Sequence, residues 1–172
     1  MEKRVEVLDL ENDPRRVARR YALSQVLIHW TVVVLVFVQW MTFDAIHRTH
    51  RTILPPRPVD LVEHAVHTYS GIAIGTLMVL LLGIRIFRGS PQSLDNGWRR
   101  ALSLAVHLGL YAALLLQAAT GFTASYLFGG AGRIHVFVWN VILVLLALHV
   151  AGALYHLVRR DGVVPRILPP RR

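Results

Sequence analysis

The chain has 172 residues, a net charge of +9, an apolar share of 54% and a positive mean hydropathy of +0.47. This is too apolar for an ordinary soluble domain, and the arginines flank long apolar runs, which argues against a nucleic-acid-binding protein. The sequence has no cysteine, which excludes disulfides, thiolate metal sites, iron–sulfur clusters and haem attached through thioether bonds.

Four apolar stretches are each long enough to cross a bilayer, which takes about 20 residues of helix. We predict them at residues 22–43, 64–87, 101–128 and 134–158, with proline and glycine in the connections. The expected fold is therefore all-α, an integral membrane four-helix bundle over residues 21–160. A charged segment, 1–20, precedes this domain, and a basic tail, 161–172, follows it.

The distribution of positive charge predicts the orientation. Fifteen of the 19 lysines and arginines lie in the N-terminal segment, around the connection between the second and third spans, or in the C-terminal tail. The positive-inside rule therefore places both termini in the cytoplasm. The connection at residues 129–133 is so short that the third and fourth spans should form a tight antiparallel pair.

Four histidines within the spans sort by depth into two layers. His29 and His149 lie near the cytoplasmic side of the first and fourth spans, and His67 and His135 lie near the external side of the second and fourth. On one helix, His135 and His149 are 14 residues apart, so they point within about 40° of each other and are separated by about 21 Å. We therefore predict that His29 pairs with His149 and that His67 pairs with His135.

A two-histidine site suits haem iron better than zinc, which needs more ligands. A cation transporter generally has carboxylates deep within the membrane. In this chain Asp44, Asp60 and Glu63 lie near an interface instead. Iron with both axial positions filled by imidazole has no open site for substrate and exchanges single electrons. The histidine pattern thus predicts two non-covalent b-type haems and an electron carrier, in preference to a bundle of hydrogen-bonded polar residues.

The other histidines leave alternatives open. His107, inside the third span, is a rival to His29, and His64 is an alternative to His67 one turn away. We expect His47 and His50 to be solvated in an external loop. His156, at the cytoplasmic boundary, is best explained as an interfacial side chain.

Two further features suit a haem pocket but have ordinary explanations. Gly71 and Gly75 follow His67 at steps of four residues and leave a smooth strip for a flat macrocycle, although small residues at this spacing also form helix-packing seams. Arg85 and Arg88 would suit haem propionates, although cytoplasmic flanks are basic in any case.

The chain resembles the bacterial cytochrome b561 family, which is related to the cytochrome b subunits of membrane hydrogenases. The resemblance covers residues 21–172 and rests on Ile28-His29-Trp30, His67-Thr-Tyr-Ser-Gly71, His107-Leu-Gly-Leu-Tyr111 and the pair His135 and His149. It implies a diheme four-helix bundle in the bacterial inner membrane, with ligands at His29, His67, His135 and His149.

The resemblance also implies exchange of electrons with membrane quinone, such as ubiquinone, in a respiratory chain. Some similar proteins oxidise superoxide and pass the electron to quinone, and others anchor a redox complex in the membrane. These are alternative functions for this chain.

Two departures from the family bear on these alternatives. The resemblance implies a longer external connection between the third and fourth spans than the one at 129–133, so an external substrate or quinone site formed by that loop would be missing. Such a bare face would suit a periplasmic cytochrome or an enzyme subunit instead. The segment 1–20 has no evident counterpart.

Overall fold

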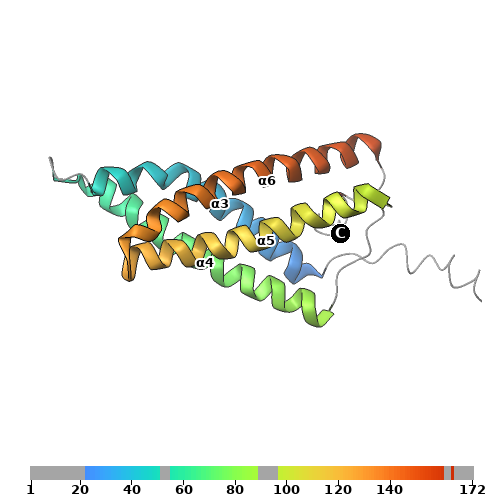
Figure 1. The fold of residues 1–172 in the computed structure, drawn as a ribbon, viewed down its shortest axis with the longest axis horizontal. Helices are drawn as coiled ribbons and strands as arrows, with labels where there is room; N and C mark the ends of the chain where they lie inside the picture. The colour runs from blue at the N-terminus through green and yellow to red at the C-terminus, as the bar shows by residue number, and fades with distance from the viewer. Residues whose placement is uncertain (1–21, 51–54, 89–96, 161–163, 165–172) are drawn as a thin grey trace, which may run out of the picture.

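Four long helices make up the structure, a computed structural model that describes residues 22–50, 55–88, 97–160 and 164. In chain order they are α3 (Leu23–Thr49), α4 (Pro58–Arg88), α5 (Gly97–Tyr126) and α6 (Gly132–Arg159), with a single 3-10 turn, η1 (Gly129–Ala131), between α5 and α6 (Figure 1). This confirms the all-α four-helix prediction and the tight connection between the last two spans. The segments 1–20 and 161–163 and most of the C-terminal tail lie outside the described residues.

The helices are longer than the apolar runs that predict them. Helix α4 begins at Pro58, because a proline in the first turn lacks only an N–H that has no helical acceptor anyway. Helix α3 continues to Thr49, so the expectation of a loop at His47 was wrong: His47 lies in the last turn of α3. Polar residues beyond an apolar run can continue a helix into the interface, and hydropathy alone does not detect them.

Each helix has the length and composition of a membrane span. In the most apolar 18-residue window of each one, only 6% to 22% of the residues are buried inside the protein. The remaining surface carries exposed large apolar side chains, such as Phe37, Trp40, Leu80 and Val144. Such a surface is stable only against lipid, and the chain is therefore a multi-pass membrane protein.

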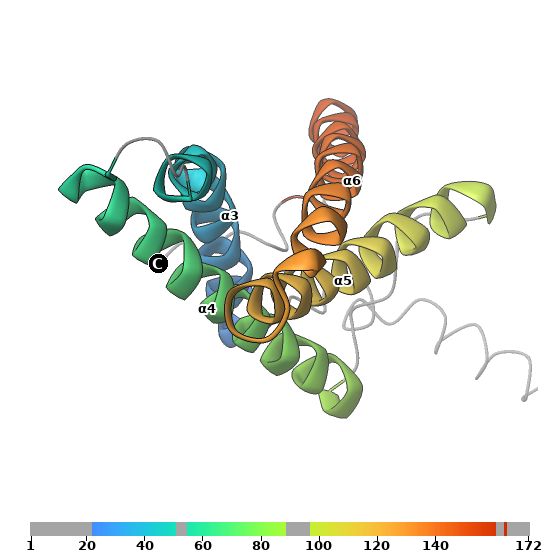
Figure 2. The ribbon, with the colours of Figure 1, turned by 60° about the vertical axis from the view of Figure 1, so that its left-hand side comes forward.

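The helices pack in sequence, α3 on α4, α4 on α5 and α5 on α6. Among the described residues, no Cα of α6 lies within 8 Å of a Cα of α3 or of α4. Figure 2 shows α3 and α6 standing apart. We call the end where α3 begins and α6 ends the terminal end, and the end with Thr49 and η1 the loop end.

A small apolar core lies between these two ends. All four helices contribute to it, and its buried members are Val32, Ile74, Met78, Ala113, Leu114, Val138 and Ile142. Ile142 is only 1% exposed and lies seven residues from both His135 and His149 on the same helix. Seven residues are close to two helical turns, so one face of α6 presents histidine, isoleucine and histidine in succession.

Candidate functional site

Helices α3 and α6 bring His29 and His149 together toward the terminal end. The two half-buried imidazole rings have centroids 6.2 Å apart and planes inclined at 57°. We call these two residues the terminal-end pair. Trp30 lies edge-on to His29, with ring centroids 5.6 Å apart.

Helices α4 and α6 bring His67 and His135 together toward the loop end. These half-buried rings have centroids 6.4 Å apart and planes inclined at 70°. We call these two residues the loop-end pair. The structure thus juxtaposes both histidine pairs expected from depth in the sequence.

The separation in both pairs suits a metal ion held between two imidazoles. A metal–imidazole nitrogen bond is about 2 Å long and the ring centroid lies about 1 Å behind that nitrogen, so two such rings on opposite sides of one ion have centroids about 6 Å apart. Both pairs also bridge helices whose Cα atoms do not come within 8 Å of each other in the described ranges. The donor set and spacing therefore fit iron with two axial imidazoles.

His107 lies beside the terminal-end pair. Its ring centroid is 5.1 Å from that of His149, and the two planes are nearly perpendicular at 88°. This is an edge-to-face contact, about 1 Å too short for a metal ion between the rings. The Nδ1–H of His107 donates to the carbonyl of Ser103 in its own helix, 2.6 Å away.

His64 belongs to a different group of residues at the loop end. Its Nδ1 lies 2.7 Å from the hydroxyl of Thr49, and its ring is 5.2 Å from that of His50. Both of these partners are at the end of α3, whereas His135 is on α6. The structure therefore pairs His67, and not His64, with His135.

Hydrogen bonds hold both rings of the loop-end pair. The Nδ1 of His67 is 3.1 Å from the hydroxyl of Thr42 on α3, and the Nδ1 of His135 is 3.0 Å from the backbone carbonyl of Gln117 on α5. The side-chain amide nitrogen of Gln117 lies 3.0 Å from the Nε2 of His135, while its Oε1 is buried with no partner among the described residues. The amide therefore lies on the side of the ring where an axial ligand would meet iron.

A buried polar group ties α3 to α4 next to His67. The amide nitrogen of Gln39 donates to the backbone carbonyl of His67 at 2.6 Å and to the hydroxyl of Ser70 at 2.7 Å. The hydroxyl of Ser70 in turn donates to the carbonyl of Val66. These bonds fix the turn of α4 that carries His67.

The glycines divide between helix packing and histidine placement. A methyl group at Gly75 would lie 2.7 Å from the side chain of Ala118, so Gly75 allows α4 and α5 to approach closely. At Gly71 it would make ordinary contact with the amide of Gln39, at 3.4 Å. At Gly121 it would meet the ring of His135 at 2.9 Å, so Gly121 leaves the space that His135 occupies.

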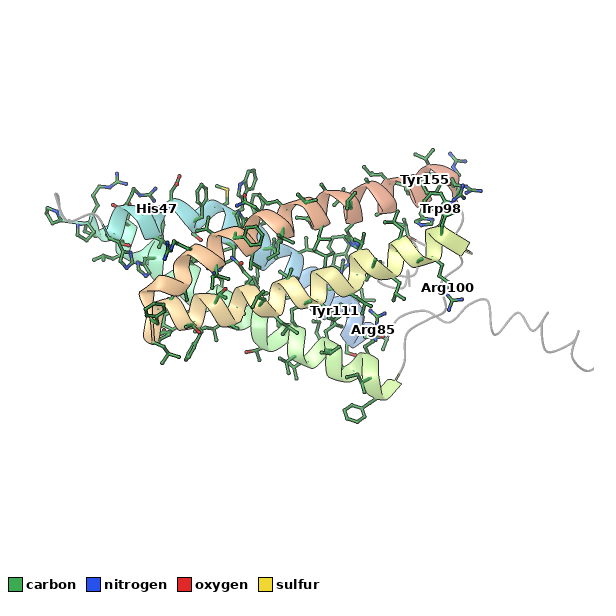
Figure 3. The ribbon with its side chains drawn as sticks, viewed as in Figure 1. His47, Arg85, Trp98, Arg100, Tyr111 and Tyr155 are labelled. Carbon is green, nitrogen blue, oxygen red and sulfur yellow. The ribbon has the colours of Figure 1, made fainter. Side chains whose placement is uncertain are left out.

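Arg85 is positioned near the terminal end by an aromatic ring. Its guanidinium lies 5.4 Å from the ring centroid of Tyr111 on α5, one helical turn beyond His107 (Figure 3). This cation–π contact holds a positive charge near the layer of His29 and His149. Arg88 ends α4, and its side chain lies outside the described part of the structure.

A compact ion cluster joins α3 to α4 at the loop end. The side chain of Arg48 donates to Asp60 at 2.6 Å and also bonds to Glu63, and Arg57 donates to Asp60 at 2.9 Å. The hydrogen bond to Asp60 raises the pKa of Arg57 above its ordinary value. Asp60 and Glu63, near the interface, are thus each paired with arginine.

Five residues at the loop-end pair were not among the sequence candidates: Gln39, Thr42, Gln117, Thr120, whose hydroxyl is 3.3 Å from the Nδ1 of His135, and Gly121. Their one sequence signal is that Gln39, Thr42 and Gln117 are polar within apolar spans, where such side chains seek partners on other helices. Gly121 gives no signal of its own, because its role depends on where the ring of His135 falls.

Comparison with known proteins gives two findings. A family model described as prokaryotic cytochrome b561 matches residues 20–170, which include all four helices. The chain is also similar to a protein named cytochrome b562 from Cereibacter sphaeroides, with 28% identity over 158 residues that cover 88% of this chain and 96% of that protein.

Proposed function

We propose, from the premise that this chain belongs to the prokaryotic cytochrome b561 family, that it carries electrons across the membrane through two b-type haems, each held between two histidines. Membership makes the chain a b-type cytochrome that binds haem b and takes part in electron transfer. The two haems and their ligands are our proposal: His29 with His149 at the terminal end, and His67 with His135 at the loop end.

The observation that carries this proposal is the spacing of the two pairs. Ring centroids at 6.2 and 6.4 Å match the span of an axially ligated iron, and each pair joins α6 to a helix whose backbone stays more than 8 Å away at Cα. Simple hydrogen bonding between helices would not require the same separation twice.

The chemistry of such a site is limited by its ligands. A haem held by two imidazoles would supply one-electron redox chemistry, with no iron position open to oxygen or substrate. The four histidines would hold the two haems, and 14 residues of α6 separate the two histidine layers by about 21 Å along the helix axis. The apolar core around Ile142 keeps water out of the region between them.

Arginines at the terminal end suit the carboxylates of a haem in that layer. Arg85, held over Tyr111, is the described side chain that we propose for a propionate contact, with Arg88 one turn further along α4. The same arginine excess supports an orientation with both termini in the cytoplasm, in the bacterial inner membrane. The loop end then faces the periplasm.

We extend the proposal to exchange of electrons with membrane quinone. Most of the helical surface is apolar and exposed toward lipid, so a lipid-soluble carrier such as ubiquinone has access to the bundle within the bilayer. Superoxide as the donor, or a partner subunit that uses this chain as its membrane anchor, are the competing functions.

The haem assignment is tested by counting haem in purified variants, using pyridine haemochrome and reduced-minus-oxidised spectra. We expect two haem b per chain in the wild type. His29→Ala and His149→Ala should each remove the same spectral component, and His67→Ala and His135→Ala the other. One haem per chain, or loss of the same component in all four variants, contradicts the proposal.

The electron partner is tested on the same protein in lipid nanodiscs. We expect ubiquinol to reduce the oxidised haems on the time scale of turnover. Rapid reduction by superoxide, with none by quinol, would assign the chain to the superoxide-oxidising group. Reduction only in the presence of a co-purified subunit would assign it to the membrane anchors.

A further inference from the structure

We propose that Thr42 is a positioning residue for His67, and that its hydrogen bond makes the loop-end haem the one with the lower midpoint potential. This inference rests on the proposed function, because it requires that His67 and His135 hold a haem. It adds an order of midpoint potentials to the two proposed haems.

The geometry around Thr42 points to the nitrogen of His67 that carries the proton. Thr42 is only 8% exposed, and its hydroxyl donates to the carbonyl of Val38, 2.8 Å away in its own helix. A hydroxyl has a single hydrogen, so toward His67 its oxygen accepts, and the Nδ1–H of His67 is the donor at 3.1 Å. The lone pair of His67 is thereby left on Nε2, the atom that would face iron.

A hydrogen bond from Nδ1–H also changes the ligand electronically. It makes the imidazole a stronger electron donor through Nε2, as outer partners of metal-bound histidines do. A stronger donor stabilises ferric iron more than ferrous iron, and therefore lowers the midpoint potential. His135 receives the same support, since its Nδ1–H donates to the carbonyl of Gln117 at 3.0 Å.

The terminal-end pair lacks this support. The structure gives His29 and His149 no hydrogen bond to any described residue. Their ring neighbours outside the pair are Trp30, edge-on to His29, and His107, edge-on to His149. An imidazole whose Nδ1–H has no hydrogen-bond acceptor donates less electron density to iron. The terminal-end ligands therefore favour the reduced haem more than the loop-end ligands do.

The distribution of charge also favours a lower midpoint potential at the loop end than at the terminal end. Within the described residues, the carboxylates Asp44, Asp60 and Glu63 are all at the loop end, where arginines pair with Asp60 and Glu63. The terminal end carries Arg85, Arg99, Arg100, Arg159 and Arg160 with no described carboxylate beside them. Over the full sequence, the segments that flank the terminal end hold 15 lysines and arginines and 7 aspartates and glutamates. This excess of positive charge favours the more negative, reduced haem, which raises the potential of the terminal-end site.

The test is a spectroscopic redox titration of the purified full chain in nanodiscs. We expect two one-electron steps in the wild type. Thr42→Val and Thr42→Ala, which remove the acceptor, should both raise the lower step and leave the upper step in place, whereas Thr42→Ser should titrate like the wild type. Thr76→Val is the matched control, because Thr76 is exposed on α4 and bonds only to the carbonyl of Ile72 in its own helix.

Several results would overturn the inference while leaving two haems in place. These are an unchanged lower step in Thr42→Val and Thr42→Ala, a shift of the upper step instead, or an equal shift in Thr42→Ser. Loss of haem from both Thr42→Val and Thr42→Ala, with normal loading of Thr42→Ser, would show that the hydroxyl governs binding and not potential. A wild type with one haem per chain would instead refute the proposed function.

Discussion

The two histidine pairs have nearly the same ring separation but very different surroundings. His67 and His135 are held from behind by Thr42 and by the carbonyl of Gln117, and Gln39 braces the adjacent turn of α4. His29 and His149 have no such hydrogen bonds within the described structure and are flanked by a third imidazole. The protein orients the rings of one pair itself, while the other pair depends on apolar packing.

This difference shows that two histidine pairs with nearly the same ring separation can differ in how their rings are oriented. A ring fixed by a hydrogen bond has a defined tautomer and a defined direction, and little of its orientation is left for the cofactor to impose. A ring held only by packing keeps more rotational freedom, and its ligand properties follow from nearby charge. We therefore expect mutations at the two ends to affect haem binding in different ways.

The largest effect should come from filling the space behind the loop-end pair. Gly121→Ala places a methyl group 2.9 Å from the ring of His135, which is too close for both to remain in place. We expect loss of the loop-end haem, so that pyridine haemochrome gives about half the wild-type haem per chain. Gly83→Ala is the control, because a methyl group there meets nothing within 4 Å, and it should keep both haems. Full haem content in Gly121→Ala would mean that His135 does not need this position.

Next in size is the loss of the brace between α3 and α4. Gln39→Leu removes two interhelical hydrogen bonds and should cost about 1–2 kcal/mol of stability, judging from such bonds in other membrane bundles. Thermal release of the loop-end haem, followed by absorbance, should occur at a lower temperature than release of the terminal-end haem. Asn140→Leu is the control, since Asn140 is exposed and bonds only within α6. If Gln39→Leu lowered the release temperature of both haems equally, the two ends would not differ in this respect.

A smaller effect of opposite sign should follow from Gln117→Leu. The amide of Gln117 lies 3.0 Å from the Nε2 of His135, and this bond must be given up when Nε2 binds iron. Removing a bond worth about 1 kcal/mol should tighten haem binding about fivefold at the loop end, measured by haem titration of the haem-free protein. Weaker binding in this variant would show that Gln117 supports the haem-bound state instead.

The smallest effect is expected at His107. Its ring is too close to His149 for a shared metal ion, and its Nδ1–H is already bonded to the carbonyl of Ser103. His107→Ala should therefore retain two haems and change only the band shape of the terminal-end component, whereas His29→Ala loses that component. The reverse pattern would make His107 the ligand in place of His29.

Much of this architecture could be predicted from the sequence because the bilayer constrains it. Apolar runs of more than 20 residues located all four helices, and 14-residue spacing on one helix placed His135 and His149 on one face. The depth of His29 and His67 in the membrane then predicted a partner for each of them. The structure places the rings of each predicted pair next to each other. These inferences need only helix geometry and a count of residues from each interface.

The supporting residues could not be found in this way. The contact of Thr42 with His67 depends on the rotation of α3 against α4, and that of Gly121 with His135 depends on how closely α5 and α6 pack. Neither rotation nor spacing is encoded in hydropathy, because both arise from side-chain packing across the bundle. For the same reason, close packing of Gly75 against Ala118 is only one of two explanations that the sequence offers for this glycine.

The most direct test of the central claim is the distance between two irons in one chain. Pulsed dipolar electron paramagnetic resonance on the oxidised protein in nanodiscs measures it without disturbing a ligand. The separation of His135 and His149 along α6 predicts two low-spin ferric centres about 21 Å apart. A single ferric centre without intramolecular dipolar coupling would contradict the account.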